Sequence, residues 1–253
     1  MALIHQKPNP GSAKASAHAP PGSRVYAIGD IHGRADLLRR LHGHILDDAA
    51  AAPDLRKIVV YLGDYVDRGP DSSGVIDILI NRPLEGFERH HLKGNHEAMM
   101  IRFLESGAGS EMWMMNGARD TLESYGLGFS DTALYRYDAK GLAQTFTDAV
   151  PQSHRAFLGR LALHHAEGDY LFVHAGLKPG VALEDQDEND LIWIRDEFTR
   201  TDTDFGVIVV HGHSIRIAPD ARPNRIGIDT GAWRTGILTA AVLEGGGVRF
   251  LQT

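Results

Sequence analysis

Polar side chains of three chemical types recur directly behind apolar segments of the chain. In VYAIGDIHGRADLL, residues 25–38, an apolar run ends in a carboxylate and an imidazole with a glycine on each side. The same succession returns in YLGDYVDRG, LKGNHEAM, LFVHAG and VIVVHGHS, at residues 61–69, 92–99, 171–176 and 207–214. Carboxylate, imidazole and amide groups are hard or borderline metal ligands, and the chain has no cysteine to compete with them. The pattern therefore indicates a metal site.

The side chains in these segments outnumber the roughly four ligands that a tetrahedral zinc site needs. They are Asp30, His32, Asp64, Asn95, His174 and His213. A mixed set of this size, with one carboxylate shared, suits two metal ions that lie about 3.5–4 Å apart. Each segment alone is explained equally well by a turn or by a buried histidine, because short motifs have a high false-positive rate. Five such segments in order, each behind a predicted strand, favour the metal interpretation.

Alternating strands and helices must position these groups. Apolar runs predict strands at the positions that precede the first three motifs, and helical spacing of apolar residues follows each motif. The strands are 24–28, 57–62 and 87–92, and the helices are 35–49, 72–81 and 95–106. This succession predicts a largely parallel sheet with helices on its faces, and ligands bind at the carboxyl ends of the strands in such sheets. Flanking glycines let the backbone turn at once and approach an ion or a phosphate without a Cβ in the way.

The remainder of the chain divides into a helical and a β-rich part. Residues 111–163 show helical periodicity without a strong strand, and we interpret them as a helical insert that caps one end of the sheet. The β-rich part predicts a second sheet packed on the first, with residues 244–247 as a hairpin turn. Its predicted strands are 169–173, 206–210, 224–228, 238–243 and 248–251. Residues 24–253 are accordingly expected to form a single α/β domain.

Composition narrows the classes of partner. The 253 residues have a formal net charge of −7, so no nucleic-acid binding and no attraction to anionic membranes are expected. Residues 1–23 are rich in Ala, Pro, Gly, Ser and Lys and lack the apolar segment of a signal peptide, which predicts a disordered leader. No run reaches the roughly 18 apolar residues of a membrane span, and a cytoplasmic location is expected. The sequence leaves the oligomeric state open.

The motifs GDIHG, GDYVDRG, GNHE, HAG and GHS, in this order, resemble those of the calcineurin-like metallophosphoesterases. The likeness is closer still to the phosphoprotein phosphatase family, in its bacterial and phage-lambda-phosphatase branch. It runs from residue 29 to residue 214, and NRIGIDTGAW at 224–233 also fits. The resemblance implies an α/β fold in which a β-sandwich of mixed sheets is flanked by helices, with the helical insert added to it.

The resemblance also implies roles for the individual residues. It places Asp30, His32 and Asp64 on a first metal ion, and it lets Asp64 bridge to a second ion that is also bound by Asn95, His174 and His213. His96 matches the general acid of the family, and Asp67 the carboxylate that orients it. Arg68, and Arg195 in LIWIRDEF, match the arginines that grip the phosphate. Two divalent ions are expected as cofactors, with manganese preferred, and iron or zinc also accept this ligand set.

The reaction that the resemblance implies is the hydrolysis of a phosphate monoester, by in-line attack of a metal-bridging hydroxide. A serine or threonine is a poor leaving group, so protonation by His96 is expected to help by a factor of about 10²–10⁴. The expected substrate is a phosphoprotein or phosphopeptide, and the protein a serine/threonine phosphatase.

Two alternatives stay open. One is a symmetrical diadenosine tetraphosphate hydrolase or another nucleotide phosphoesterase, a branch that usually has GDLVARG and GNHD. Asp67 and Glu97 are of the protein-phosphatase type and favour the first hypothesis. The other is a non-catalytic phosphate-binding module, which is disfavoured because every ligand and both arginines are present. Two residues near the motifs are assigned lesser roles: His211 is expected to be structural or to support the ligands, and Asp229 to cap a turn.

Overall fold

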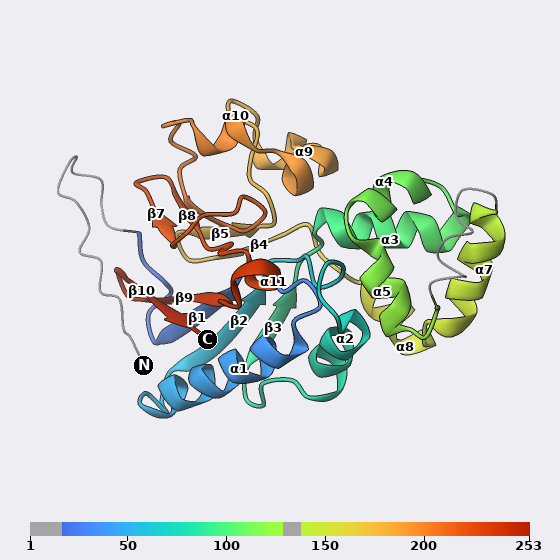
Figure 1. Ribbon diagram of the computed structural model, residues 1–253. Helices are drawn as coiled ribbons and strands as arrows, with labels where there is room; N and C mark the ends of the chain where they lie inside the picture. Colours follow the sequence, from blue (N-terminus) through green and yellow to red (C-terminus); the bar gives the residue numbers. More distant parts are fainter. Residues whose placement is uncertain (1–16, 129–137) are drawn as a thin grey trace.

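Two five-stranded β-sheets pack face to face in the computed structural model, which describes residues 17–128 and 138–253 (Figure 1). The first sheet has the order β10-β9-β1-β2-β3 and the second the order β4-β5-β6-β8-β7. The strands of the first sheet are β1 (Ser23–Ile28), β2 (Arg56–Tyr61), β3 (Glu88–His91), β9 (Thr239–Glu244) and β10 (Gly247–Gln252). Those of the second are β4 (His164–Glu167), β5 (Tyr170–Val173), β6 (Ile208–His211), β7 (Asp220–Ala221) and β8 (Arg225–Gly227). Both sheets are mixed, as predicted.

The core between the sheets follows from the alternation of side chains along each strand. Val25 and Ala27 of β1 point to one side and pack with Phe172 of β5 and Val210 of β6. Tyr26 of β1, with its neighbours on the same face, points to the other side, where helices cover the sheet. The central strands are therefore buried on both faces, which explains why their sequences are continuous apolar runs.

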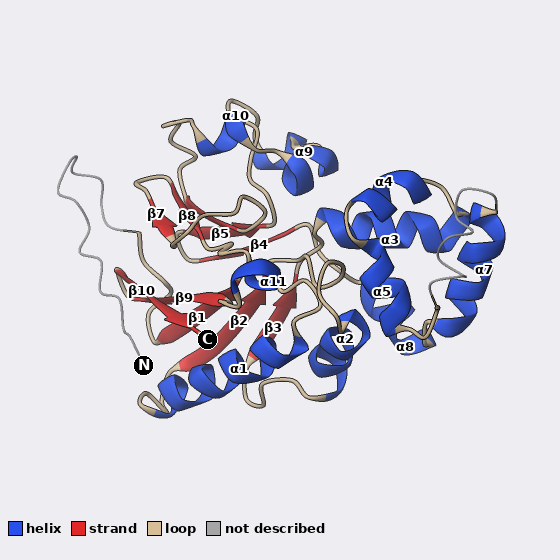
Figure 2. Cartoon of the chain, in the orientation of Figure 1, coloured by secondary structure: helices blue, strands red, loops and turns tan. Residues whose placement is uncertain are grey.

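Helices α1 (Ala35–Ala50) and α2 (Ser72–Asn81) cover the outer face of the first sheet (Figure 2). In α1 apolar side chains recur at helical spacing, and Leu38, Leu41 and Ile45 are buried, whereas Leu46 is exposed. Asp71 is the N-cap of α2, and its carboxylate accepts a hydrogen bond from the N–H of Gly74 at 2.9 Å. Both helices agree with the prediction to within one residue.

A group of helices lies at one end of the molecule, beside β3 and α2 (Figure 1). They are α3 (Asn95–Ser106), α4 (Ser110–Met115), α5 (Ala118–Ser124), α7 (Ala139–Ala149) and α8 (Gln152–Leu158). Phe103, Trp113 and Phe146 meet there with ring centroids 5.0–6.3 Å apart. The described part of residues 111–163 is thus mainly helical, and residues 129–137 lie outside the described residues.

The last two strands differ from the prediction. We expected β9 and β10 in the second sheet, but β9 pairs antiparallel with β1 and adds both strands to the first sheet. Strands β4 and β7 were not predicted; β4 is rich in histidine and half exposed, and β7 has two residues. Four short helical segments were also not expected. They are η2 (Leu183–Asp185), α9 (Glu188–Trp193), α10 (Asp196–Thr199) and α11 (Ala232–Thr235).

The boundary of the predicted leader also differs from the structure. Ser23 belongs to β1, and just before it Ala19 is buried and its N–H donates to the carbonyl of Gly245 at 2.9 Å. Residues 17–23 are therefore packed on the domain, while the prediction for residues 1–16 lies outside the described residues. Within the described residues, no helix has both the length and the apolar character that a membrane span requires.

Candidate active site

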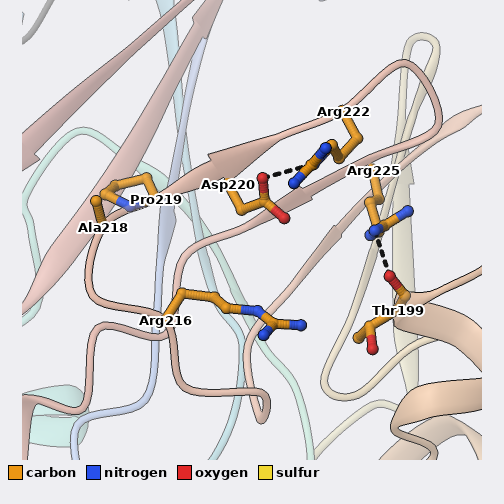
Figure 3. Close-up of a pocket in the computed structure, with 7 residues that line it drawn as sticks. All are labelled: Thr199, Arg216, Ala218, Pro219, Asp220, Arg222 and Arg225. Carbon is orange, nitrogen blue, oxygen red and sulfur yellow. Dashed lines mark hydrogen bonds and ion pairs between the residues drawn. The ribbon is translucent and has the colours of Figure 1, made fainter.

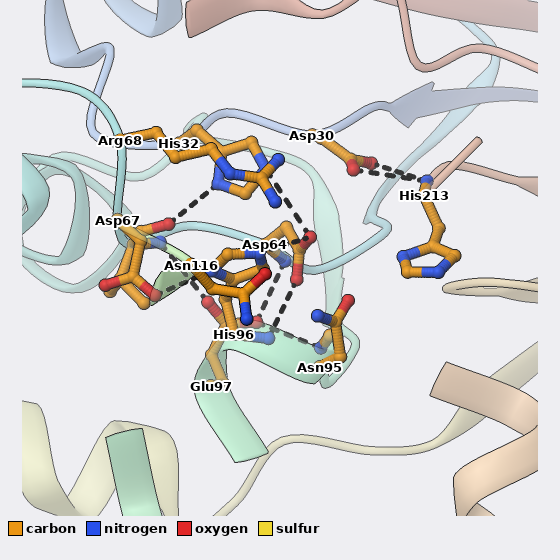
Figure 4. A network of polar contacts seen from close by, with 12 residues as sticks. Asp30, His32, Asp64, Asp67, Arg68, Asn95, His96, Glu97, Asn116 and His213 are labelled. Carbon is orange, nitrogen blue, oxygen red and sulfur yellow. Dashed lines mark hydrogen bonds and ion pairs between the residues drawn. The ribbon is translucent and has the colours of Figure 1, made fainter. Parts of the chain in front are cut away.

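The carboxyl ends of five strands bring the six predicted metal ligands into one cluster. Figure 4 labels five of them, all except His174. The first sheet supplies them from the segments after β1, β2 and β3, and the second sheet from those after β5 and β6. Each is at most 4% exposed: Asp30, His32, Asp64, Asn95, His174 and His213. Residues separated by up to 183 positions in the sequence thus meet where the two sheets face each other.

Asp64 lies at the centre of the cluster. Its Oδ2 is 3.5 Å from Nε2 of His32, and its Oδ1 is 3.4 Å from Nε2 of His174. Two triads have ligand atoms within 4.8 Å of one another, and both contain Asp64. One triad is His32, Asp64 and His96, and the other is Asp64, His174 and His213. The shared carboxylate has the position that the prediction required of a bridging ligand.

Asp30 and Asn95 complete the cluster from its two sides. Both carboxylate oxygens of Asp30 accept from the backbone N–H of His213 at 3.1 Å, and Oδ1 of Asn95 lies 3.1 Å from Nε2 of His174. Asp30 is outside the two triads, although it contacts the backbone of a member of the second.

Backbone carbonyls orient two of the imidazoles. Nδ1 of His32 lies 2.8 Å from the carbonyl oxygen of Val66, and Nδ1 of His174 lies 2.8 Å from that of Leu62. Each Nδ1 donates a proton to its carbonyl, so the Nε2 atom turns toward the cluster, an arrangement common among metal-binding histidines. Burial lowers the pKa of His32 to about 3, and burial followed by the neighbouring His174 lowers that of His213 to about 2. The imidazoles of His32 and His213 are therefore neutral, and each has a nitrogen lone pair that can bind a metal ion.

The donor set fits divalent cations. Nε2 of His213 is buried and has no hydrogen-bond partner among the described residues. Burial, followed by repulsion from Asp229, raises the pKa of Asp30 well above its usual value. Buried carboxylates that crowd one another are costly unless positive charge compensates them. Cations at this place would neutralise the carboxylates and ligate the orphaned nitrogen.

Backbone conformation concentrates strain at the same place. Within residues 17–128 and 138–253, the non-glycine residues with positive φ are His32, Asp64, Asp67, Arg68 and His213. All five are predicted site residues. Side chains with a Cβ rarely adopt this region of φ, and each such residue costs about 1 kcal/mol or more. The left-handed turns aim these side chains back over the strand ends from which they emerge.

Two of the glycines in the motifs make room for ligands. A Cβ on Gly94 would lie 2.1 Å from Oδ1 of Asp64, and one on Gly212 would lie 2.0 Å from Oδ1 of Asp30. The sequence analysis assigned such glycines to a close approach of ion or phosphate. In the structure the groups that approach them are the ligand carboxylates themselves.

Glu97 joins the segment after β2 to the start of α3. Its side chain is fully buried and accepts from the backbone N–H groups of Asp64 and Tyr65 at 2.8 and 2.7 Å, and from that of Val66 at 3.3 Å. It also accepts from the N–H of Gly94 at 2.9 Å, which is the N3-to-N-cap half of a capping box at the start of the helix. Burial, followed by repulsion from Asp64, raises the pKa of Glu97 to about 7. In the sequence analysis Glu97 served only to distinguish two branches of the family, whereas its contacts here are structural.

His96 and Asp67 form a buried pair beside the cluster. Nδ1 of His96 lies 2.6 Å from Oδ2 of Asp67, and Nε2 of His96 is buried with no hydrogen-bond partner in the described part of the chain. Burial lowers the pKa of His96, but the carboxylates of Asp64 and Asp67 outweigh this effect and leave it above its usual value. The pair therefore favours the protonated form of His96 more than in a free imidazole.

The helical insert supplies two further donors to Asp67. The indole Nε1–H of Trp113, in α4, donates to Oδ2 at 2.8 Å, and the hydroxyl of Thr121, in α5, donates to Oδ1 at 2.6 Å. Asp67 is fully buried, so these bonds and the one to His96 determine its orientation. The sequence analysis missed Trp113 and Thr121, because no motif surrounds them.

Both predicted phosphate-binding arginines lie beside ligand histidines. Nη1 of Arg68 is 2.9 Å from Nε2 of His32, and Nη1 of Arg195 donates to the carbonyl of His213 at 3.2 Å. Arg68 also lies over the ring of Trp233, 5.6 Å from its centroid. Both guanidinium groups thus lie next to the ligand cluster.

Asp229 and His211, the two residues near the motifs, lie in different surroundings. Asp229 accepts from the N–H of Gly231 at 2.8 Å, as the predicted turn cap requires, and it also faces Asp30, which was not foreseen. His211 is buried and packs edge-on against Phe198, with ring centroids 5.0 Å apart, which agrees with a structural role.

Residues 23–230 match the family model of the calcineurin-like phosphoesterases. The chain therefore belongs to this family of metal-dependent phosphoester hydrolases, as the motifs predicted. Members of the family use divalent metal ions, and the His and Asp triads described above are suited to binding them.

Individual relatives differ in the activity for which they are named. Over 94 residues the chain is 37% identical to serine/threonine-protein phosphatase 2 of Escherichia coli, a match that covers 37% of this chain and only 38% of that protein. It is 30% identical over 155 residues to a symmetrical bis(5'-nucleosyl)-tetraphosphatase of Dechloromonas aromatica, which covers 61% of this chain and 44% of the relative. It is 24% identical over 244 residues to the asymmetrical bis(5'-nucleosyl)-tetraphosphatase PrpE of Oceanobacillus iheyensis, with 86% and 87% covered.

Solved structures confirm the fold. A putative diadenosine tetraphosphatase superposes with a TM-score of 0.61 and 22% identity, over 92% of this chain and 95% of that one. A cold-active protein tyrosine phosphatase superposes with a TM-score of 0.53 and 16% identity, over 90% and 78%. The predicted fold of two mixed sheets flanked by helices is therefore confirmed.

Asp64→Asn keeps the shape of the central side chain and removes its charge. We expect metal affinity to fall at least about tenfold, and phosphatase activity to fall with it. Calorimetric titration of the metal-free protein with manganese measures the first, and turnover of p-nitrophenyl phosphate the second. Asp47→Asn, at an exposed position of α1, is the control. Unchanged manganese affinity in Asp64→Asn would contradict a central role of this carboxylate.

Glu97→Gln replaces one acceptor oxygen by an NH2 group that faces backbone donors. We expect a loss of about 2 kcal/mol in the free energy of unfolding, because two buried backbone N–H groups lose their shared acceptor oxygen. Urea unfolding of the metal-free protein measures the change, with Glu105→Gln on the exposed side of α3 as the control. Equal stability of the two variants would show that the hydrogen bonds of Glu97 do not stabilise the segment after β2.

Thr121→Val removes one donor to Asp67 and nearly preserves the side-chain shape. If Asp67 orients a general acid, kcat should fall about tenfold on an alkyl phosphate and little on p-nitrophenyl phosphate. Thr145→Val, at an exposed position of α7, should change neither rate. A merely structural role of Thr121 would lower both rates to the same extent.

Proposed function

We propose that this protein hydrolyses phosphate monoesters of serine and threonine in proteins or peptides. The observation that carries the proposal is the His96–Asp67 pair, in which a fully buried carboxylate holds an imidazole at 2.6 Å. An alkoxide leaves slowly without a proton, so a fixed acid is most useful on this class of substrate.

We further propose that Asp30, His32 and Asp64 hold one divalent ion, and that Asp64, Asn95, His174 and His213 hold a second. The two triads share Asp64 and separate His32 from His174 and His213, and the orphaned Nε2 of His213 offers a ligand atom. Asp30 and Asn95 are assigned by the resemblance of the motifs. Bound ions would neutralise the phosphoryl oxygens and acidify a water molecule for the attack, and manganese is our first choice among them.

His96 donates the proton to the leaving oxygen in this proposal. Its Nδ1 is engaged with Asp67, so the proton available for transfer is on Nε2. That atom is buried and free of other partners among the described residues, and it lies 3.8 Å from Oδ2 of Asp64 at the cluster. Trp113 and Thr121 keep Asp67, and through it the imidazole, in place.

Arg68 and Arg195 bind the phosphoryl group in this proposal. The guanidinium of each is already within hydrogen-bond distance of a ligand histidine or its backbone. Arginine suits this task because its planar donors match two phosphate oxygens at once.

Hydrolysis of a dinucleoside tetraphosphate is the second candidate function. It is favoured by the extent of the similarity: the asymmetrical tetraphosphatase of Oceanobacillus iheyensis covers 86% of the chain, against 37% for the phosphatase of Escherichia coli. A nucleotide leaving group needs less proton assistance, so the elaborate support of Asp67 is the argument against it.

The deciding experiment compares kcat/KM of manganese-loaded protein on a phosphoserine peptide and on diadenosine tetraphosphate. We expect the peptide to be preferred at least about tenfold, which corresponds to about 1.4 kcal/mol in transition-state binding. A preference for the dinucleotide would overturn the proposal and establish the second candidate.

His96→Asn tests the role of the acid directly. We expect metal content to stay at the wild-type level and kcat on the phosphoserine peptide to fall by about 10²–10⁴, with a smaller effect on p-nitrophenyl phosphate. Elemental analysis and steady-state kinetics measure the two. Equal slowing on both substrates would exclude His96 as the general acid.

A further inference from the structure

A second polar pocket lies between α10 and the hairpin formed by β7 and β8 (Figure 3). Its volume is about 320 Å³, enough for a phosphoryl group and part of the molecule that bears it. The lining residues are Thr199, Arg216, Ala218, Pro219, Asp220, Arg222 and Arg225. None of them is a predicted metal ligand or a predicted catalytic residue.

Three arginines and one carboxylate give this pocket an excess of positive charge. Asp220 accepts from Nε of Arg222 at 2.7 Å, so these two charges compensate each other. In residues 17–128 and 138–253, neither Arg216 nor Arg225 has a carboxylate within 4.0 Å of its guanidinium. Arg216 and Arg225 thus form no direct ion pair there, although Asp220 and Asp202 attract Arg225 from farther away. The lining residues carry three positive charges against the one negative charge of Asp220, in a chain whose formal net charge is −7.

Arg225 is held rigidly in spite of its burial. It is 7% exposed, and its guanidinium donates to the carbonyls of Thr199 and Thr201 and to Oδ1 of Asn224. Neutral acceptors satisfy its hydrogen bonds but do not cancel its charge, and a buried charge without a counterion is costly. Burial lowers the pKa of Arg225, the carboxylates of Asp220 and Asp202 act in the opposite direction, and the neighbouring Arg222 and Arg216 add to the lowering. An anion in the pocket would relieve this cost.

Arg216 is the exposed arginine of the pocket. It follows the ligand His213 by three residues, and its backbone N–H donates to the carbonyl of Asp229 at 2.9 Å, which fixes the start of the side chain. In Figure 3 its guanidinium extends into the space below Asp220, toward Arg225 and Thr199. A fixed, buried guanidinium and an adaptable, exposed one are arranged to face the same ligand.

We propose that this pocket binds a phosphoryl group, separately from the one at the metal cluster. Guanidinium groups from two sides match the oxygens of a tetrahedral dianion, which lysines would recognise less specifically. The inference goes beyond the proposed function, because it does not depend on which phosphoester the metal cluster cleaves. The group is either a second phosphate of the substrate or free inorganic phosphate.

Arginine side-chain NMR on the zinc-loaded protein tests the site, with inorganic phosphate as the probe. We expect the Nε–H signals of Arg216 and Arg225 to shift saturably, apart from those of Arg68 and Arg195. Arg216→Gln should weaken phosphate binding about tenfold, as measured from the Nε–H signal of Arg225. Arg200→Gln, an exposed arginine of the same region that pairs with Asp196, should leave it unchanged.

Two results would overturn the proposal. In the first, phosphate shifts only the signals of Arg68 and Arg195, which limits binding to the metal cluster. In the second, chloride at the same ionic strength moves Arg216 and Arg225 as phosphate does, which reduces the effect to screening. Because Arg216 is exposed, its replacement is expected to leave the fold intact, and a circular-dichroism melt verifies this.

Kinetics on peptides with one and with two phosphoserines identify the source of the group. If the substrate supplies it, the doubly phosphorylated peptide has the higher kcat/KM, and Arg216→Gln removes the advantage but keeps the rate on the single phosphopeptide. If free phosphate is the ligand, Arg216→Gln leaves the ratio of the two peptides unchanged while the NMR titration still reports binding. Both results support the site and assign its occupant.

Discussion

Four backbone N–H groups converge on the carboxylate of Glu97, and three of them belong to the turn that carries Asp64, the residue shared by both triads. This turn is strained, since Asp64 and Asp67 both have positive φ. The hydrogen bonds offset the strain locally, and the same carboxylate starts the helix that bears Asn95 and His96. Asp64, Asn95 and His96 thus share one support, and an aspartate at position 97, shorter by one methylene, would not span the same donors.

Most of the fold could be predicted from periodicity alone. Buried parallel strands are continuous apolar runs, and α1 and α2 show clear helical spacing, so their limits were found within one or two residues. The sheet membership of β9 and β10 was not predictable in this way, because pairing with β1 depends on contacts over more than 200 residues. Strand β4 was missed because it is short and polar.

The candidate site could be predicted where carboxylate, imidazole or amide side chains occur beside glycines in a motif. All six predicted ligands, and His96 with Asp67, are brought together by the structure. Trp113 and Thr121 lie in no such motif, and a buried tryptophan and a helical threonine are common in any core. Their role depends on which way α4 and α5 turn, and only the three-dimensional arrangement reveals it.

The origin of the ligands has a consequence for the lifetime of the folded protein. The first sheet supplies Asp30, His32, Asp64 and Asn95, and the second supplies His174 and His213. Ions held by both sets would join the sheets as a cross-link does, and their binding energy would add to the barrier against separating them. Resistance to proteolysis would then depend on metal supply, so that a cell short of the metal would lose the protein as well as its activity.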